Sequence, residues 1–382
     1  MGTLTNLATK RQTTPDWGAI AAALAQRFAE RAAGHDGADS FVAENVRDLR
    51  TAKLFSAGVP TELGGGGAEY AELADILRIL ARGCGATALA FAMHTHGVAM
   101  NVWRLRHDKA PVEPLLRRVA AEELILVSSG GSDWLASGGR AERVEGGYRI
   151  SATKRFASGS PVGDVLMTGA VLDDPEAGPT VLHFGLSLQA PAVTVVDNWR
   201  ALGMRGSGSG DVVIDGAFVA EAAVGVRRPL GRWHHLFHVI TMVALPLIYA
   251  VYTGLAEAAR EVALDHARRR SADPHLPTAV GRMETELLAA QLALRQMLEL
   301  GAEAVPGAAT TSRVLAARTL TARACLATVD AAMAVVGGAA MRRDLPLERI
   351  FRDIQGARFH PVAEQPQLCL TGRHALGLPL DA

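Results

Sequence analysis

Three histidines are the side chains of this 382-residue chain whose positions most strongly suggest chemistry. His94 and His96 stand in the segment Met93-His94-Thr95-His96, and His360 lies near the end of the chain. Imidazole titrates near neutral pH, so it can exchange a proton with a reacting molecule, and it can also ligate a metal. Residues two apart point to different sides of a helix, so the pair is poorly spaced for a shared metal and none is predicted. A histidine that lines a pocket and a purely structural histidine both fit the spacing.

A turn of small and aromatic residues is the second candidate. Tyr148, Ile150 and Ala152 alternate with polar residues as in a half-buried strand, and residues 165–171 form a similar run. Between these strands stands Phe156-Ala157-Ser158-Gly159. An aromatic ring, a hydroxyl and a glycine are grouped there, where a backbone can approach a planar ligand closely.

The elements around these residues are mostly helical. Apolar residues recur at helical spacing before residue 122 and again after residue 233, and strand patterns occupy the region between. Four predicted helices joined by short loops follow the strands and favour an antiparallel bundle. We therefore predict an α+β fold that is mainly α, with three domains: an N-terminal helical domain (1–122), a middle β-barrel-like domain (123–230) and a C-terminal four-helix bundle (231–382).

Composition narrows the possible functions. The chain has 39 acidic and 39 basic residues, so nothing in its charge favours nucleic acid as a partner. Cys84, Cys325 and Cys369 are too far apart in sequence to suggest a disulfide framework or a metal knuckle. The first residues lack the apolar core of a signal peptide, and the apolar run 240–250 is too short to span a bilayer. We expect a cytoplasmic protein that does not bind a membrane.

The order of these segments resembles the acyl-CoA dehydrogenase superfamily along nearly the whole chain. The motifs that carry the resemblance are Gly58–Gly67, Ser128-Ser129-Gly130-Gly131-Ser132-Asp133, Gly147–Ser158, Trp199–Ser207 and Leu345–Asp353. The resemblance implies a homotetramer with a flavin, FAD or FMN, between the β domain and the bundle.

The same resemblance implies flavin-binding roles for particular residues. Ser128, Ser129 and Ser158 would lie near the flavin ring, with Phe156 packed beside it, and hydroxyls there can hold its polar edge. Arg270 matches the arginine that meets the flavin pyrophosphate at a subunit interface, although a solvated helix end explains it equally well. Gly337 and Gly338 match paired glycines that admit a neighbouring subunit to the adenosine part. The family's phenylalanine–glycine pair and its glutamine are replaced by Asp273-Pro274 and Ala334.

The catalytic carboxylate of the dehydrogenases is missing from this sequence. Its two family positions fall on Pro361 and near Ala244, neither of which can accept a proton, and Glu364 is the nearest substitute. His360 instead follows Arg352 by eight residues, as a histidine does in the related two-component flavin monooxygenases.

We therefore predict a flavin-dependent monooxygenase. It would take reduced flavin from a partner reductase and use O2 to hydroxylate a small organic substrate. His94, His96 and His360 would supply its acid and base groups. The alternatives are an FAD-dependent acyl-CoA dehydrogenase with Glu364 as a relocated base, and a catalytically inactive relative.

Overall fold

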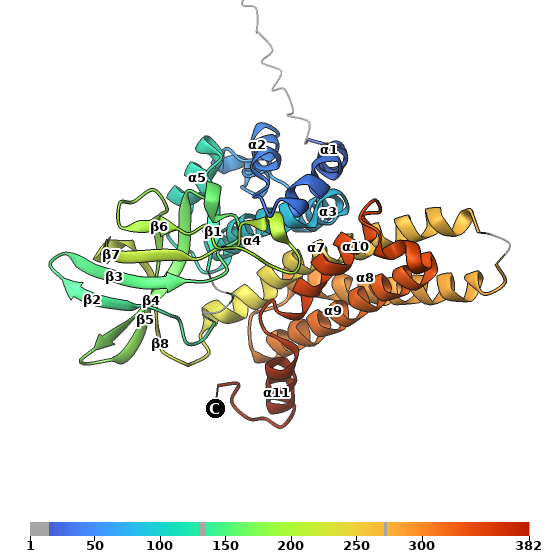
Figure 1. Ribbon diagram of the computed structural model, residues 1–382. Coiled ribbons are helices and arrows are strands. Elements are labelled where there is room, and N and C mark those ends of the chain that lie inside the picture. The colour runs from blue at the N-terminus through green and yellow to red at the C-terminus, as the bar shows by residue number, and fades with distance from the viewer. Residues whose placement is uncertain (1–14, 130, 132–133, 271–272, 382) are drawn as a thin grey trace, which may run out of the picture.

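The computed structural model describes residues 15–129, 131, 134–270 and 273–381. Helices make up both ends of the chain and pack against each other, while the sheet lies to one side of them (Figure 1). The first helices are α1 (Trp17–Gly37), α2 (Ala43–Thr51), α3 (Tyr70–Gly83), α4 (Gly85–His107) and α5 (Glu113–Glu122).

The described strands form one sheet in the order β6-β7-β3-β2-β4-β5-β8, with the short β1 paired in parallel with β4. Tyr148 and Ile150 are buried on one face of β3, as their alternation predicts. The strands are β1 (Leu126–Ser128), β2 (Arg140–Val144), β3 (Gly147–Lys154), β4 (Val165–Asp174), β5 (Gly178–Ser187), β6 (Val193–Val195), β7 (Val212–Ala220) and β8 (Val224–Pro229).

The C-terminal helices are α7 (His235–Arg268), α8 (Leu276–Glu303), α9 (Ala308–Val336), α10 (Leu347–Asp353) and α11 (Glu364–Ala375). By length and composition α7 and the helical run Ala308–Met341 could each cross a membrane. In α7, 94% of the most apolar window is buried inside the protein, so its composition is that of a core helix. The sequence predicts a fourth bundle helix over about 347–357, but α10 is shorter, because it gives way at Ile354 to a 3₁₀ segment that ends at Arg358.

One hydrophobic core joins the first helices to the bundle. α3 and α4 both pack on α7, and buried residues from all three belong to the same cluster. At the crossing of α3 and α7, a Cβ placed on Gly254 would lie 2.2 Å from the carbonyl oxygen of Arg78, so only glycine allows this approach. The predicted architecture, helices followed by a sheet and a helical bundle, is confirmed. The exact boundaries at residues 122 and 230 stay predictions.

Candidate functional site

One face of helix α4 lies against the segments that carry the candidate serines. Ala90, Met93 and His96 are three residues apart and therefore share that face. The Ser128 hydroxyl at the end of β1 lies 3.3 Å from Nε2 of His96 and 3.8 Å from the sulfur of Met93. A Cβ built on Gly159 would lie 3.6 Å from the carbonyl oxygen of Ala90. The end of β1 and the turn after β3 thus meet at the same stretch of α4.

His94 points away from this face and is held by the backbone. Its Nε2 lies 2.7 Å from the carbonyl oxygen of Phe55, and its Nδ1 accepts a hydrogen bond of 3.0 Å from the N–H of Leu126. The side chain is buried, and burial lowers its pKa to about 4. Both ring nitrogens are occupied in the neutral form. This geometry favours a structural role for His94, and its predicted role as an acid or base group stays a prediction.

His96 differs from His94 because one of its ring nitrogens has no partner within the described residues. Its ring is partly buried, and its Nδ1 has no hydrogen-bond partner among the described residues although water does not reach it. Burial, followed by the charge that His360 would carry, lowers the pKa of His96 to about 4. An unpartnered buried nitrogen is costly unless a ligand or water completes it, so His96 is the member of the pair suited to a bound molecule.

His360 reaches the same place from the other end of the chain. It follows the 3₁₀ segment after α10, and its Nδ1 lies 2.6 Å from the hydroxyl of Tyr252 on α7. Burial, and then the charge of Arg318, lower the pKa of His360 to about 4, partly opposed by a hydrogen bond with Gly356. The charge that His360 would carry is, after burial, the next cause of the lowered pKa of His96, so the two imidazoles are close enough to interact electrostatically, and both are neutral at pH 7.

A chain of serine hydroxyls supports the turn after β3. Ser158 lies 2.7 Å from Ser209, which lies 2.6 Å from Ser207, and all three are buried. Phe156 is held at a positive φ of 60° and remains 54% exposed, with its ring 6.2 Å from that of Trp199. The turn therefore presents an open aromatic face beside a buried hydroxyl, which fits the edge of a planar ring system.

Ser129 differs from its neighbour Ser128. It is buried, and its hydroxyl lies 2.7 Å from that of Thr168 on β4. Its position near a flavin stays a prediction, with the hydroxyl already partnered within the chain. Gly130, Ser132 and Asp133 of the predicted flavin loop lie outside the described residues.

The remaining predicted flavin residues follow the C-terminal ends of α7 and α9, and the end of α7 lies far from the sheet (Figure 1). Arg270, just after α7, donates to the carbonyl oxygen of Val335 at 3.2 Å and to Asp273 at 2.9 Å. Gly337 and Gly338 follow α9 there, and a Cβ on either would meet nothing within 4 Å. Arg270 and the glycines are thus brought together, on an open surface, but not beside Ser128 or Ser158 of the same chain.

The geometry does not favour a dehydrogenase base. Glu364 begins α11 and is paired with Arg323, whose hydrogen bond is the main cause of its lowered pKa. A base that removes a proton beside a thioester carbonyl needs the opposite shift, toward neutral pH. Ala244 is buried within α7, and Pro361 has no titratable group.

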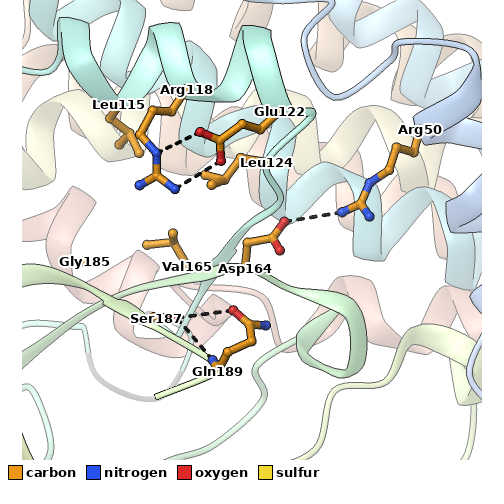
Figure 2. A pocket seen from close by; sticks show the side chains of 10 residues that line it. All are labelled: Arg50, Leu115, Arg118, Glu122, Leu124, Asp164, Val165, Gly185, Ser187 and Gln189. Atoms are coloured by element: carbon orange, nitrogen blue, oxygen red, sulfur yellow. Dashed lines mark hydrogen bonds and ion pairs between the residues drawn. The ribbon is translucent and has the colours of Figure 1, made fainter.

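A surface pocket of about 450 Å³ lies elsewhere, between α5, the start of β4 and the end of β5 (Figure 2). Its charged groups are largely paired with each other: Arg118 with Glu122, and Arg50 with Asp164. Asp164 also accepts the backbone N–H of Ile125 at 2.7 Å. The pocket contains none of the predicted site residues, and its paired charges indicate a structural junction.

Tyr252 and Arg318 are the residues near the site that sequence reasoning missed. The Tyr252 hydroxyl contacts Nδ1 of His360, 108 residues away in the sequence. Arg318 on α9 donates to the carbonyl oxygens of Ala357 and His360 at 3.1 and 2.5 Å. Neither stands in a motif. The one signal available in the sequence was the position of Arg318 within an otherwise apolar helix. A buried guanidinium charge needs several hydrogen-bond acceptors, so such a position indicates a polar contact nearby.

Comparison with known proteins identifies the family. The family model "Acyl-CoA dehydrogenase, N-terminal domain" matches residues 18–109, and "Acyl-CoA dehydrogenase, C-terminal domain" matches residues 247–365. The chain is 29% identical over 332 residues to the amino sugar nitrososynthase DnmZ of Streptomyces peucetius, covering 82% of this chain and 81% of the relative. It is 25% identical over 313 residues to a dibenzothiophene monooxygenase of Rhodococcus erythropolis, covering 74% and 72%.

A solved structure is similar along almost its whole length. KijD3, in complex with FMN and dTDP-3-amino-2,3,6-trideoxy-4-keto-3-methyl-D-glucose, superposes with a TM-score of 0.86 at 27% identity, covering 97% of this chain and 96% of that one. The two family models together match more than half of the chain, at both of its ends. The chain therefore belongs to the acyl-CoA dehydrogenase superfamily.

Proposed function

We propose that this chain is a flavin-dependent monooxygenase that oxygenates a small organic substrate. The observation that carries the proposal is a pair of neutral, electrostatically coupled imidazoles, His96 beside the Ser128 hydroxyl and His360 next to the position where the dehydrogenases require a carboxylate. The similarity to an amino sugar nitrososynthase and to a dibenzothiophene monooxygenase supports it.

The residues of the site have separate tasks in this proposal. Reduced flavin, when bound, supplies the two electrons with which O2 gives one oxygen atom to the substrate and the other to water. Phe156 offers an aromatic face to the ring system, and the hydroxyl chain that begins at Ser158 holds its polar edge. The side chains of His96 and Ser128, which contact each other, form hydrogen bonds with the substrate. His360 donates a further hydrogen bond to the substrate.

FMN is the flavin that we propose. The guanidinium of Arg270 is already engaged by Asp273 and by the Val335 carbonyl, so it is less available to the second phosphate that distinguishes FAD. Ala334 offers no hydrogen bond where the family's glutamine stands. The complex of KijD3 with FMN supports this choice.

A homotetramer completes the proposal. Arg270, Gly337 and Gly338 match family positions at a subunit interface, and a Cβ on either glycine would meet nothing within 4 Å in one chain, so this surface is open to a second copy. We further propose a separate flavin reductase as the source of reduced FMN, and a reducing cytoplasmic location, which free cysteines at positions 84, 325 and 369 favour.

The experiment is an oxygen-uptake assay with chemically defined components. A reductase with NADH supplies reduced FMN to the full chain in the presence of candidate amines, thioethers and phenols. Hydrogen peroxide released by free flavin is removed with catalase and measured separately. The proposal expects a substrate-dependent oxygenated product with reduced FMN and none with oxidised FMN. Oxidation of an acyl-CoA without any reductase would contradict it.

A further inference from the structure

The environment of His360 determines which of its nitrogens carries the proton. Tyr252 is buried, and its hydroxyl lies 2.6 Å from Nδ1 of His360, with the two rings 5.5 Å apart. Gly356 makes room for this contact, because a Cβ there would lie 2.7 Å from the Tyr252 oxygen. The hydroxyl is thus fixed in place by packing on both sides.

The direction of the hydrogen bond follows from the requirement that buried donors find acceptors. Among the described residues, Nδ1 of His360 is the hydrogen-bond partner of the Tyr252 hydroxyl. The His360 ring also has a hydrogen bond with the Gly356 backbone. If that bond were donated from Nδ1, the Tyr252 hydroxyl would have to accept from the same nitrogen, and its own hydrogen would be left without an acceptor. Burial raises the pKa of Tyr252 well above its usual value, so the phenol keeps its proton and remains a donor.

We propose that Tyr252 is a positioning residue that holds neutral His360 with its proton on Nε2, so that His360 faces the site as a hydrogen-bond donor. The proposal rests on the proposed function for its catalytic consequence, and it separates the tasks of the two histidines. His360 donates from Nε2, whereas the ring of His96, with Nδ1 unpartnered, remains able to accept a hydrogen bond.

Arg318 completes the arrangement from the backbone side. Its guanidinium donates to the carbonyl oxygens of Ala357, Arg358 and His360, so the segment that carries the imidazole is fixed as well as its ring. Its positive charge also disfavours protonation of His360. A neutral His360 with a defined tautomer is the result of both contacts.

The test is the tautomer itself, read by ¹⁵N nuclear magnetic resonance of the full chain labelled in its twelve histidine rings. The His360 signal is assigned by its loss in His360→Gln. We expect Nε2 to be protonated and Nδ1 to be unprotonated at pH 7 in the unmodified protein. Protonation on Nδ1 would overturn the proposal whether or not the protein proves to be a monooxygenase.

Tyr252→Phe and Tyr249→Phe each remove one buried hydroxyl, and comparing them tests whether the Tyr252 hydroxyl sets the tautomer. Tyr252→Phe removes the donor to Nδ1, so His360 should show mixed tautomers, and kcat should fall about 10- to 100-fold with little change in KM. Tyr249→Phe removes a hydroxyl that donates to the Ala357 carbonyl instead, and should leave the tautomer unchanged. Gly356→Ala displaces the Tyr252 hydroxyl without deleting it and should reproduce the mixed tautomers. An unchanged tautomer in Tyr252→Phe would overturn the proposal.

Discussion

Arg318 donates a hydrogen bond of 2.5 Å to the carbonyl oxygen of His360, and this contact joins the middle of α9 to the segment that follows α10. The arginine is buried and has no carboxylate partner among the described residues. Its charge is instead distributed over the carbonyl oxygens of the closing segment and the ring of Tyr249, which lies 5.0 Å away. The position of His360 therefore depends on a residue that has no reacting group.

Replacement of Arg318 by methionine should loosen the closing segment. The carbonyl oxygens of residues 357, 358 and 360 lose their donor, so backbone amide exchange over residues 354–362 should accelerate. Turnover should fall about 10- to 100-fold because His360 is no longer held in position. Hydrogen exchange followed by mass spectrometry measures the first effect. Arg323→Met is the matched control, since Arg323 lies on the same helix and pairs with Glu364 instead; unaltered exchange in Arg318→Met would refute the role of Arg318.

His94 and His96 should respond differently to replacement by leucine. His94→Leu leaves the Phe55 carbonyl and the Leu126 N–H unpaired in a buried position, so the free energy of unfolding should fall by about 2–4 kcal/mol. His96→Leu removes a single 3.3 Å contact and should change that free energy by less than about 1 kcal/mol, while turnover falls about 100-fold or more. Urea unfolding and steady-state assays of both variants make the comparison. Equal losses of stability would show that the two histidines are not divided in this way.

Stability should decline as the pH falls from 6.5 toward 4. His94, His96 and His360 have folded-state pKa values of about 4, and His183 of about 3, below the usual 6.5, so the unfolded chain binds protons that the folded one does not. Each contributes up to about 1.4 kcal/mol per pH unit within this window. Asp353 has the opposite effect on stability. Burial raises its pKa to about 6, so below that pH the folded state binds a proton that the unfolded state does not.

The measurement is urea unfolding at intervals between pH 7 and pH 5. A positive slope of unfolding free energy with pH is expected, corresponding to a net uptake of protons on unfolding. His94→Leu should flatten the slope by roughly the contribution of one histidine. Stability that increases on acidification over this range would contradict the assignment of neutral buried histidines.

Glu364→Gln should leave catalysis unchanged. The carboxylate lies at the start of α11, is 42% exposed, and is engaged by Arg323. Its lowered pKa makes it a weak base. Product formation with reduced FMN is compared between this variant and His360→Gln, which should lose it. Loss of activity in Glu364→Gln together with retained activity in His360→Gln would revive the dehydrogenase interpretation.

Much of the fold could be predicted from the sequence because its signals are local. Alternation at Tyr148 and Ile150 and the helical period of α7 depend only on neighbouring residues. The end of α10 was missed because the 3₁₀ segment after it is held by long-range contacts, such as that of Arg318 with Ala357.

The site was harder to predict for the same reason. Spacing correctly separated His94 from His96 but did not say which one faces the backbone, since Phe55 and Leu126 are distant in sequence. The role of Tyr252 could not be predicted from the sequence, because tyrosines are common in buried helices and only the structure shows the contact of its hydroxyl with His360. Arg270 and the glycines were placed together by family resemblance alone, and the contact of Arg270 with Val335 agrees with that grouping.

Monooxygenase chemistry is tested most directly by the reaction of the reduced, FMN-loaded chain with O2 in a stopped-flow absorbance cell. We expect two phases: a near-ultraviolet absorbance that forms first, and a slower return of the oxidised flavin spectrum, with the first phase shortened or lost in His360→Gln. An anaerobic control mixes the oxidised FMN-loaded chain with a set of acyl-CoA thioesters and should show no bleaching. Return of oxidised flavin in a single phase, or bleaching by an acyl-CoA, would contradict the monooxygenase assignment.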